Sequence, residues 1–411
     1  MDANPSDARR RLTLAVVFVT IFIDFVGFSV LIPVLPLFAL RLGASALQIG
    51  WIVALYGLAQ LLFLPVWGWV SDRIGRRPVI LISLLGTAIS FAVLAAAETI
   101  PTVYLARALT GLFAASIGAA QAVVTDLTPP SERTHGMGMI GVAFGVSLVV
   151  GPAIGGALAA LHEQAPFYAI VVVAGANFLI AWRALPESRP ASLPRPPWRD
   201  LAKTFVPTPL RLLTRVHDRR IAIFLVLFFV FFAAFAVVEA MGTLYLGRRF
   251  GATELDAALF FAWVGLVLAA TQGVLLGRLV VWFGEVRLLV AGFAMMAVGV
   301  AALAWVPSYG WFFAIGPVLA IGNGLGFPTF TSLFTKACRA EEAGELLGQS
   351  NSMATAGRIV GAIGGGALMS ERFLGAPFLA AGALLTLGLV LFLALSPLLL
   401  RGLERAERGT K

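Results

Sequence analysis

Long apolar stretches alternate with short polar segments along almost the whole chain. Twelve of them are about 20 residues long, near the length that an α-helix needs to cross a hydrocarbon core roughly 30 Å thick. The runs from Leu14 to Ile23 and from Ile221 to Val237 are apolar on all sides, whereas strands of a membrane barrel alternate apolar and polar residues. The pattern predicts an all-α integral membrane protein with transmembrane helices over residues 12–39, 47–70, 78–97, 101–124, 137–160, 166–185, 221–247, 256–280, 287–305, 309–333, 346–369 and 376–399.

The composition agrees with a membrane location. Of 411 residues, 59% are hydrophobic and only 12% are charged, whereas soluble domains are typically about 45–50% apolar. The polar, basic start is followed by an apolar stretch that is too long for a signal peptide and lacks an Ala-x-Ala exit. We therefore expect this stretch to be retained as the first helix.

The net charge of +9 is distributed unevenly between the predicted loops. With the amino terminus in the cytoplasm, most arginines and lysines fall on the inner side. The outer loops hold only Arg41, Arg248, Arg249 and Arg372. This asymmetry follows the positive-inside rule, so we expect both termini in the cytoplasm and no nucleic-acid partner.

Neither a metal centre nor a catalytic constellation is apparent in the sequence. Cys338 is the only cysteine, which excludes an internal disulfide and a cysteine-based metal site. The three histidines, His135, His162 and His217, fall in predicted loops. We expect no metal, no cofactor and no enzyme activity.

The chain resembles itself at an offset of about 210 residues. Several landmarks recur in the same order: Gly43 and Gly251, Gly68 and Gly277, Gly75 and Gly284, Gly151 and Gly361, and Gly155 and Gly365. Six spans in each copy give both copies the same orientation. We predict six-helix bundles at residues 1–186 and 221–411, joined by a cytoplasmic linker at 187–220. Within the linker, residues 201–216 form either an amphipathic helix on the inner leaflet or a flexible tether.

The loop after the second span carries a specific motif, Gly68-Trp69-Val70-Ser71-Asp72-Arg73-Ile74-Gly75-Arg76-Arg77-Pro78. It resembles the signature of the major facilitator superfamily, which implies that fold and a transport function. Gly68 would let a helix approach, and Gly75 would permit a tight turn. We expect a gating latch built from Asp72 with Arg76, Arg133 or the helix end near Gly348. Alternatively, the arginines serve only topology. The complete gating set is Gly68, Asp72, Arg73, Gly75, Arg76, Arg77, Asp126, Arg133, Gly151 and Pro152.

Two further patterns resemble the drug:proton antiporter branch, and the tetracycline efflux pumps in particular. The first span has Asp24-x-x-Gly27, and the fifth has Gly151-Pro152 followed by Gly155-Gly156. Small residues on one face permit close packing, and Pro152 would bend the helix, although packing alone is an alternative role. The tetracycline pumps carry a histidine in the eighth span, where this chain has Leu268.

Four charged residues fall inside predicted spans: Asp24, Arg107, Glu239 and Arg358. A charge at mid-membrane costs at least about 2.5–3.5 kcal/mol, so each needs a reason. We predict that Asp24 carries the proton and that Arg107 responds to it, with structural roles as alternatives. Glu239 is either a second protonation site or a contact for a cationic substrate. Arg358 would pair with Glu239, recognise an anionic group or hold backbone carbonyls.

Polar residues at other span positions are candidates for substrate contact, with helix–helix hydrogen bonding as the alternative. The predicted substrate-binding set is Tyr56, Gln60, Gln121, Glu239, Tyr245, Gln272, Asn323, Gln349 and Arg358, and Asn177 is a further polar position. Phenylalanines gather in the seventh span, notably Phe228, Phe229, Phe231, Phe232 and Phe235. Some would suit an apolar binding wall, and most are expected to face lipid.

Together these features predict a proton-coupled secondary active transporter, an antiporter that exports lipophilic or cationic drug-like molecules by alternating access. A transporter of a sugar, organic anion or lipid is the alternative, since Arg107 and Arg358 could serve an anion. A non-transporting sensor is a further reading. The resemblance implies a monomer in the bacterial inner membrane, whose partners are protons, a small-molecule substrate and membrane lipids.

Overall fold

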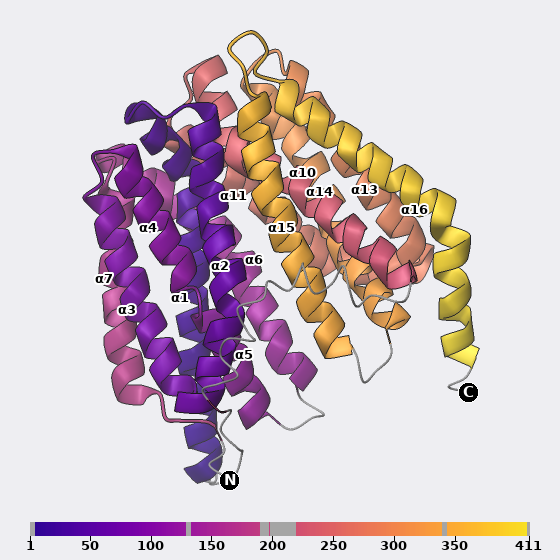
Figure 1. The fold of residues 1–411 in the computed structure, drawn as a ribbon. Coiled ribbons are helices and arrows are strands. Elements are labelled where there is room, and N and C mark those ends of the chain that lie inside the picture. Colours follow the sequence, from indigo (N-terminus) through magenta and orange to yellow (C-terminus); the bar gives the residue numbers. More distant parts are fainter. Residues whose placement is uncertain (1–4, 129–132, 190–196, 198–218, 339–342, 409–411) are drawn as a thin grey trace. The chain divides into compact units, whose positions relative to one another are not determined.

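The computed structural model describes residues 5–128, 133–189, 197, 219–338 and 343–408, and all regular structure in them is helical (Figure 1). Each predicted span coincides with a helix or a pair of helices. The α-helices are α1 (Pro5–Arg41), α2 (Ala46–Ile74), α3 (Arg76–Ala95), α4 (Ile100–Leu112), α5 (Ser116–Leu127), α6 (Arg133–Leu161), α7 (Ala165–Ala184), α10 (Arg219–Phe250), α11 (Glu254–Ala270), α12 (Leu276–Phe283), α13 (Glu285–Ala302), α14 (Gly310–Ala337), α15 (Ala343–Leu368) and α16 (Ala376–Arg408). A π-helix, η2 (Thr271–Leu275), joins α11 to α12, and a short 3₁₀-helix, η3 (Leu303–Trp305), follows α13.

Within the described residues, eleven helical segments are long and apolar enough to cross a membrane. The remaining predicted span, 346–369, is formed by α15, which is 26 residues long but carries Gln349, Asn351 and Arg358. The all-α membrane fold is therefore confirmed.

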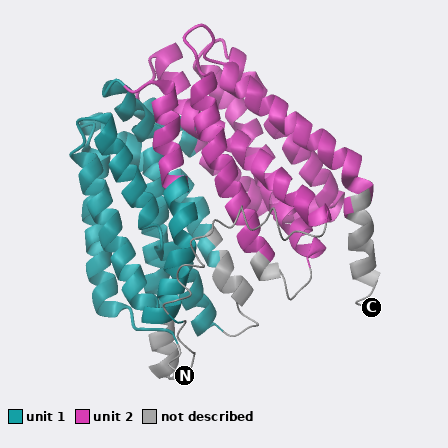
Figure 2. Ribbon diagram, in the orientation of Figure 1, with its two compact units in different colours: residues 1–43, 58–207, 254–262 teal, residues 44–57, 208–253, 263–411 magenta. Residues whose placement is uncertain are grey.

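The chain divides into two compact units (Figure 2). The first contains Met1–Gly43, Leu58–Pro207 and Glu254–Ala262, and the second contains Ala44–Gly57, Thr208–Thr253 and Trp263–Lys411. The units differ from the predicted halves in two segments. The first part of α2 belongs to the second unit, and the first part of α11 belongs to the first unit. Most of the predicted linker, including its possible amphipathic helix, lies outside the described residues.

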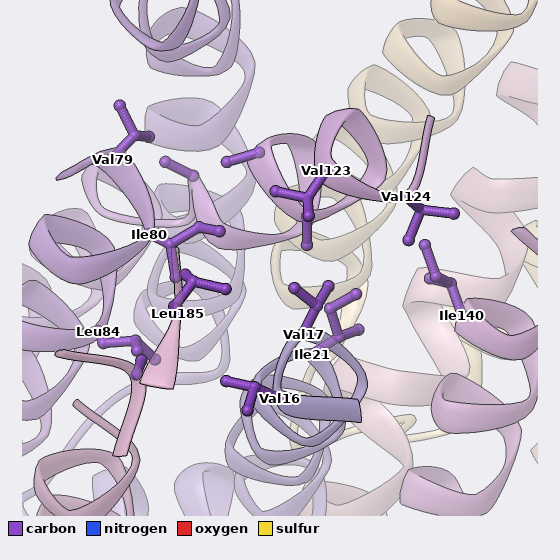
Figure 3. Packing of buried hydrophobic residues seen from close by; sticks show 14 of the residues in the cluster. Val16, Val17, Ile21, Val79, Ile80, Leu84, Val123, Val124, Ile140 and Leu185 are labelled. Carbon is purple, nitrogen blue, oxygen red and sulfur yellow. The ribbon is translucent and has the colours of Figure 1, made fainter. Parts of the chain in front are cut away.

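Aliphatic side chains form a buried cluster in the first unit (Figure 3). Val17 and Ile21 of α1 meet Ile80 and Leu84 of α3 and Val123 of α5 in this cluster, and all five are at most 1% exposed. The same cluster contains Ala119 and Ala120 of α5 and the preceding Ala115, whose small side chains let the helices approach closely.

Phenylalanines make the core of the second unit. Phe228 and Phe231 of α10 pack against Phe330 of α14 and Phe293 of α13, with ring centroids 4.2 Å apart for Phe228–Phe330 and 5.2 Å for Phe231–Phe293. Phe228 is 2% exposed and Phe231 is 1% exposed. The expectation that most seventh-span phenylalanines face lipid is therefore wrong for these two, because α13 and α14 cover that side of α10.

The glycines matched by the internal repeat occupy matching structural positions. In the described residues, positive φ occurs only at Gly43 (84°), Gly75 (110°), Gly251 (65°) and Gly284 (78°). These are two repeat-related pairs, each at a turn that a side chain would strain. The repeat therefore extends to backbone conformation.

Matching glycines also bring matching helices into contact. A Cβ added to Gly151 of α6 would lie 2.9 Å from Ser29 Cβ of α1, and a Cβ added to Gly361 of α15 would lie 2.0 Å from the carbonyl oxygen of Ala233 of α10. The pairs α1–α6 and α10–α15 are accordingly the repeat-related helix contacts, held at a distance that only glycine permits.

Replacing Gly361 by alanine should separate α10 from α15 and lower the stability by about 1–3 kcal/mol, because its Cβ would collide with backbone rather than with a flexible side chain. Gly364→Ala is the matched control three residues away, where an added Cβ meets nothing within 4 Å. Thermal unfolding of the purified protein in detergent, followed by tryptophan fluorescence, measures both. Equal melting temperatures for the two variants would contradict this packing.

Candidate functional site

The signature loop after α2 gathers charges around one arginine. Arg76 donates from Nη1 to Asp72 Oδ1 at 2.5 Å and from Nε to Asp126 Oδ2 at 3.2 Å. Arg76 is 9% exposed, and its Nη1 also donates to Ser71 Oγ at 3.2 Å. The structure therefore brings Asp72 and Arg76 of the predicted latch together with Asp126 of the predicted gating set, with Arg76 between two carboxylates. Arg133 begins α6, but its side chain lies outside the described part of the structure.

The other predicted gating residues of this loop have separate roles. Arg77 donates from Nη2 to the Trp182 carbonyl at 2.6 Å, and the Arg73 guanidinium lies 5.9 Å from the Trp69 ring centroid. A Cβ added to Gly68 would meet no described atom within 4 Å, so no helix among the described residues makes the close approach expected there.

A carboxylate that the sequence analysis did not assign closes this loop. Glu187, just after α7, accepts the backbone N–H groups of Arg76 at 2.8 Å and Arg77 at 3.2 Å, and also those of Ser188 and Arg189. It thereby caps α3, whose preceding residue, Gly75, has no side chain to do so. The sequence does hint at such a cap, because the first turn of α3 contains no acidic residue and so needs an acceptor from elsewhere in the chain.

Asp24 of α1 contacts the start of α5. Its Oδ2 accepts a hydrogen bond from the Ser116 hydroxyl, and its Oδ1 is buried without a hydrogen-bond partner among the described residues. Arg107 of α4 is 3% exposed. The described hydrogen bond of Asp24 is thus to a neutral hydroxyl, and the predicted coupling of Asp24 to Arg107 stays a prediction.

Glu239 of α10 and Arg358 of α15 form an ion pair. Arg358 Nη2 lies 2.8 Å from Glu239 Oε1 and 2.7 Å from Oε2. The side chains are 9% and 25% exposed for Glu239 and Arg358. The pair forms where Gly357 and Gly361 let α15 touch α10, so the helix contact itself positions both charges.

In the fifth predicted span, Gly151 and Pro152 lie in α6 and are both buried. The Ser29 hydroxyl donates to the Ser147 carbonyl at 2.7 Å, one turn before Gly151. This contact and the absent side chain of Gly151 join α6 to α1, the helix that carries Asp24.

The remaining substrate candidates differ in their burial. Tyr245 and Gln349 are buried, Gln272 is exposed, and Tyr56, Gln60, Gln121 and Asn323 are half-buried. Tyr245 packs against Phe378 with ring centroids 5.2 Å apart, and its hydroxyl has no hydrogen-bond partner among the described residues. Asn177 instead accepts a hydrogen bond from Thr20 at 3.3 Å, which fits the helix–helix alternative.

The eighth span contains a π-helix that the sequence analysis did not predict. In η2, Thr271 is buried and donates to the Val267 carbonyl at 2.8 Å, while Gln272 is exposed. A Cβ added to Gly324 of α14 would lie 2.9 Å from Thr271 Cγ2 and 3.3 Å from Leu268 Cδ1. Such segments are frequent at functional sites, and this one contains the exposed candidate Gln272.

No group of three or more His, Cys, Asp or Glu that could hold a metal occurs in the part of the chain that the structure describes. His135 lies in α6 rather than in a loop, because that helix begins earlier than predicted, at Arg133. His217 lies outside the described residues.

The sequence profile of the Major Facilitator Superfamily matches residues 17–362. The chain belongs to the major facilitator superfamily. This assignment makes it a membrane transporter rather than an enzyme, with a small-molecule substrate and ions as partners. Its helices and its glycine-bearing signature loop are those of a multi-pass major facilitator protein.

Several relatives of this major facilitator protein are named for drug resistance. The class C tetracycline resistance protein of Escherichia coli is 30% identical over 358 residues, which cover 85% of this chain and 87% of that protein. Multidrug resistance protein 1 of Bacillus subtilis is 29% identical over 388 residues, covering 94% and 97%. Among solved structures, the human organic anion transporter MFSD10 has a TM-score of 0.69 at 23% identity, covering 95% of this chain and 100% of that one, which shows a shared fold.

Replacing Glu187 by alanine should expose the uncapped first turn of α3 and lower the stability by about 0.5–2 kcal/mol. Glu98, an exposed acidic residue just before α4, provides the control variant Glu98→Ala. Amide hydrogen exchange in α3 is the measurement, because loss of the cap should speed exchange in the first turn. Unchanged exchange there in Glu187→Ala would contradict the capping role.

Breaking the part-buried ion pair should lower the stability by less than the about 3–5 kcal/mol that is typical of a fully buried pair, because Glu239→Ala removes the carboxylate that Arg358 contacts while water still reaches the Arg358 side chain. Arg358→Ala and the double variant complete a double-mutant cycle measured by thermal unfolding. The double variant should lose less stability than the two single variants combined. Strictly additive losses would show that the two side chains do not interact.

Proposed function

We propose that this major facilitator protein is a proton-coupled antiporter that exports lipophilic, predominantly cationic drug-like molecules. Its relatives support this proposal, because they are named as tetracycline resistance and multidrug resistance proteins. A membrane transporter confers resistance most directly by carrying the drug out of the cell. The expected coupling ion is the proton, with no other cofactor.

The different environments of the two membrane carboxylates carry the proton assignment. Glu239 is engaged by the Arg358 guanidinium, whereas the described partner of Asp24 is the Ser116 hydroxyl. A carboxylate without a cationic partner can gain and lose a proton without breaking an ion pair. We therefore assign proton carriage to Asp24 and a structural or cation-binding role to Glu239.

The proposed cycle links protonation to substrate affinity. Proton entry from outside neutralises Asp24 and weakens the attraction for a cationic substrate, which then leaves. Arg107, buried in α4, would respond to the change of charge. Asp72, Arg76 and Asp126 would hold one inner conformation, because their contacts join the end of α2 and the start of α3 to α5. Both steps belong to alternating access.

Substrate contact is proposed for the polar span residues that are not committed to the charge clusters. These are Tyr56, Gln60, Gln121, Tyr245, Gln272, Asn323 and Gln349. The proposed location is the bacterial inner membrane with both termini in the cytoplasm, and the proposed functional form is a monomer surrounded by membrane lipids, without a nucleic-acid partner.

An organic anion is the less favoured substrate class. It would require a cation free to bind it, and the Arg358 guanidinium already contacts both carboxylate oxygens of Glu239. Leu268, which stands where the tetracycline pumps carry a histidine, packs close to Gly324 and offers no polar contact. We accordingly place tetracycline itself below lipophilic cations as a substrate.

The test is proton release when tetraphenylphosphonium or tetracycline is added to purified protein in weakly buffered detergent solution. Wild-type protein should release protons on addition of the cation, and Asp24→Asn should lose most of that release. Glu239→Gln should weaken cation binding instead. If Asp24→Asn releases as many protons as wild type and still exports the cation from proteoliposomes, proton carriage by Asp24 is wrong.

A further inference from the structure

The fourth predicted span is broken in its middle. Helix α4 ends at Leu112 and α5 begins at Ser116, so Phe113, Ala114 and Ala115 form a turn at membrane depth. Backbone groups in a hydrocarbon environment must find partners within the protein, and helix ends leave N–H and C=O groups without intrahelical partners. Such a break persists only if neighbouring side chains supply the missing hydrogen bonds.

Ser83 of α3 supplies two of these bonds at the same point. Its hydroxyl donates to the Phe113 carbonyl and accepts the Ser116 backbone N–H at 3.0 Å. Trp67 of α2 donates from Nε1 to the Leu112 carbonyl at 2.6 Å. The ends of both helices at the break are therefore held by side chains of α2 and α3.

The ring of Phe113 occupies the space left by a missing side chain. A Cβ added to Gly86 of α3 would lie 2.1 Å from Phe113 Cγ, and the Trp67 ring centroid is 6.4 Å from that of Phe113. Gly86 lies about one turn beyond Ser83 on the same helix. Helix α3 thus holds the turn through both the hydrogen bonds of Ser83 and the close contact of Phe113 with Gly86.

The held turn presents Ser116 to Asp24. The same residue that gives its backbone N–H to Ser83 donates its hydroxyl to Asp24 Oδ2. The carboxylate therefore sits at the amino-terminal end of α5, where the helix dipole also favours negative charge. Ser83 is 1% exposed and Ser116 is 3% exposed, so water does not replace these contacts readily.

The other charged or titratable side chains described on helices packed against α1 have other contacts or are exposed. Asp126 of α5 accepts a hydrogen bond from Arg76, the Arg183 guanidinium of α7 lies 5.7 Å from the Trp182 ring, and Tyr168 of α7 is 52% exposed. The side chains of Arg133 and His135 at the start of α6 lie outside the described residues. Ser116 is therefore the described group that contacts Asp24 directly.

We propose that Ser116, fixed by Ser83 across the break in the fourth span, is a positioning residue that sets the proton affinity of Asp24. This inference rests on the proposed function, since it presumes that Asp24 exchanges a proton during transport. The proton adds to Oδ1, which has no partner among the described residues, and converts the carboxylate to a carboxylic acid. Ser116 continues to donate to Oδ2, so no other bond breaks.

Infrared difference spectroscopy of the full-length protein in detergent, recorded over a pH series, tests this proposal without a substrate. The carboxylic C=O band that is absent from Asp24→Asn reports protonated Asp24. In Ser116→Ala the charged carboxylate loses a donor, so the pH at which half of Asp24 is protonated should rise by about one unit. Ser83→Ala should shift it in the same direction by a smaller amount, and Ser116→Thr should restore it.

Ser90→Ala is the matched control. Ser90 is also a buried serine of α3, but its hydroxyl donates to Gly86 O of its own helix at 2.6 Å. Its loss should leave the midpoint of Asp24 unchanged. If the alanine variants do not fold, Ser116→Cys provides a donor of similar size but weaker hydrogen bonding, and it should give a smaller upward shift.

An unchanged midpoint in Ser116→Ala or Ser116→Cys would overturn the proposal, as would an equal shift in Ser90→Ala or a band that does not titrate. The proposed export function can fail independently of this result. Absence of substrate-driven proton release, with the predicted midpoint shifts intact, would reject antiport while retaining the positioning role.

Discussion

The requirement that every backbone polar group in lipid be hydrogen-bonded inside the protein underlies the other features. Along most of each span the helix itself meets this requirement. Where the fourth span breaks, Ser83 and Trp67 meet it. At the end of a span, Glu187 likewise supplies the acceptor for the first N–H groups of α3. The first of these exceptions adjoins Asp24, and the second adjoins the latch around Arg76. Two of the three charge clusters therefore adjoin places where regular helix stops, whereas Glu239 and Arg358 meet within α10 and α15.

Close contact between repeat-related helices is the second organising feature. Glycines in α6 and α15 remove the side chains that would hold these helices away from α1 and α10. The same contacts place Asp24 on a helix packed against α6, and Glu239 opposite Arg358. Duplication therefore provided one packing scheme, but the two copies carry different charges: a lone carboxylate with a hydroxyl partner in one, and an ion pair in the other.

Much of the fold and part of the site could be predicted. Spans followed from the length of apolar runs, the repeat from matched glycines, and Arg76 was one of the partners expected for Asp72 in the signature loop. The roles of Glu187 and Ser83 could not be predicted. Glu187 and Ser83 each bind the backbone of a segment more than thirty residues away, and in the case of Ser83 that backbone group is left without a helical partner only because the fourth span breaks. The π-helix in the eighth span likewise lies beside a segment far away in the sequence, because Thr271 packs against Gly324 of α14.

By itself, the sequence determined that the chain crosses a membrane repeatedly, that it is duplicated, and that a few charges are placed where their cost demands a reason, because hydropathy, periodicity and charge are properties of residues in order. Only the tertiary structure decided which charges meet. Arg358 engages Glu239 while Asp24 faces Ser116, and Phe228 and Phe231 are buried rather than lipid-facing. Partner choice depends on which helix faces touch, and that is set by packing between segments far apart in the chain.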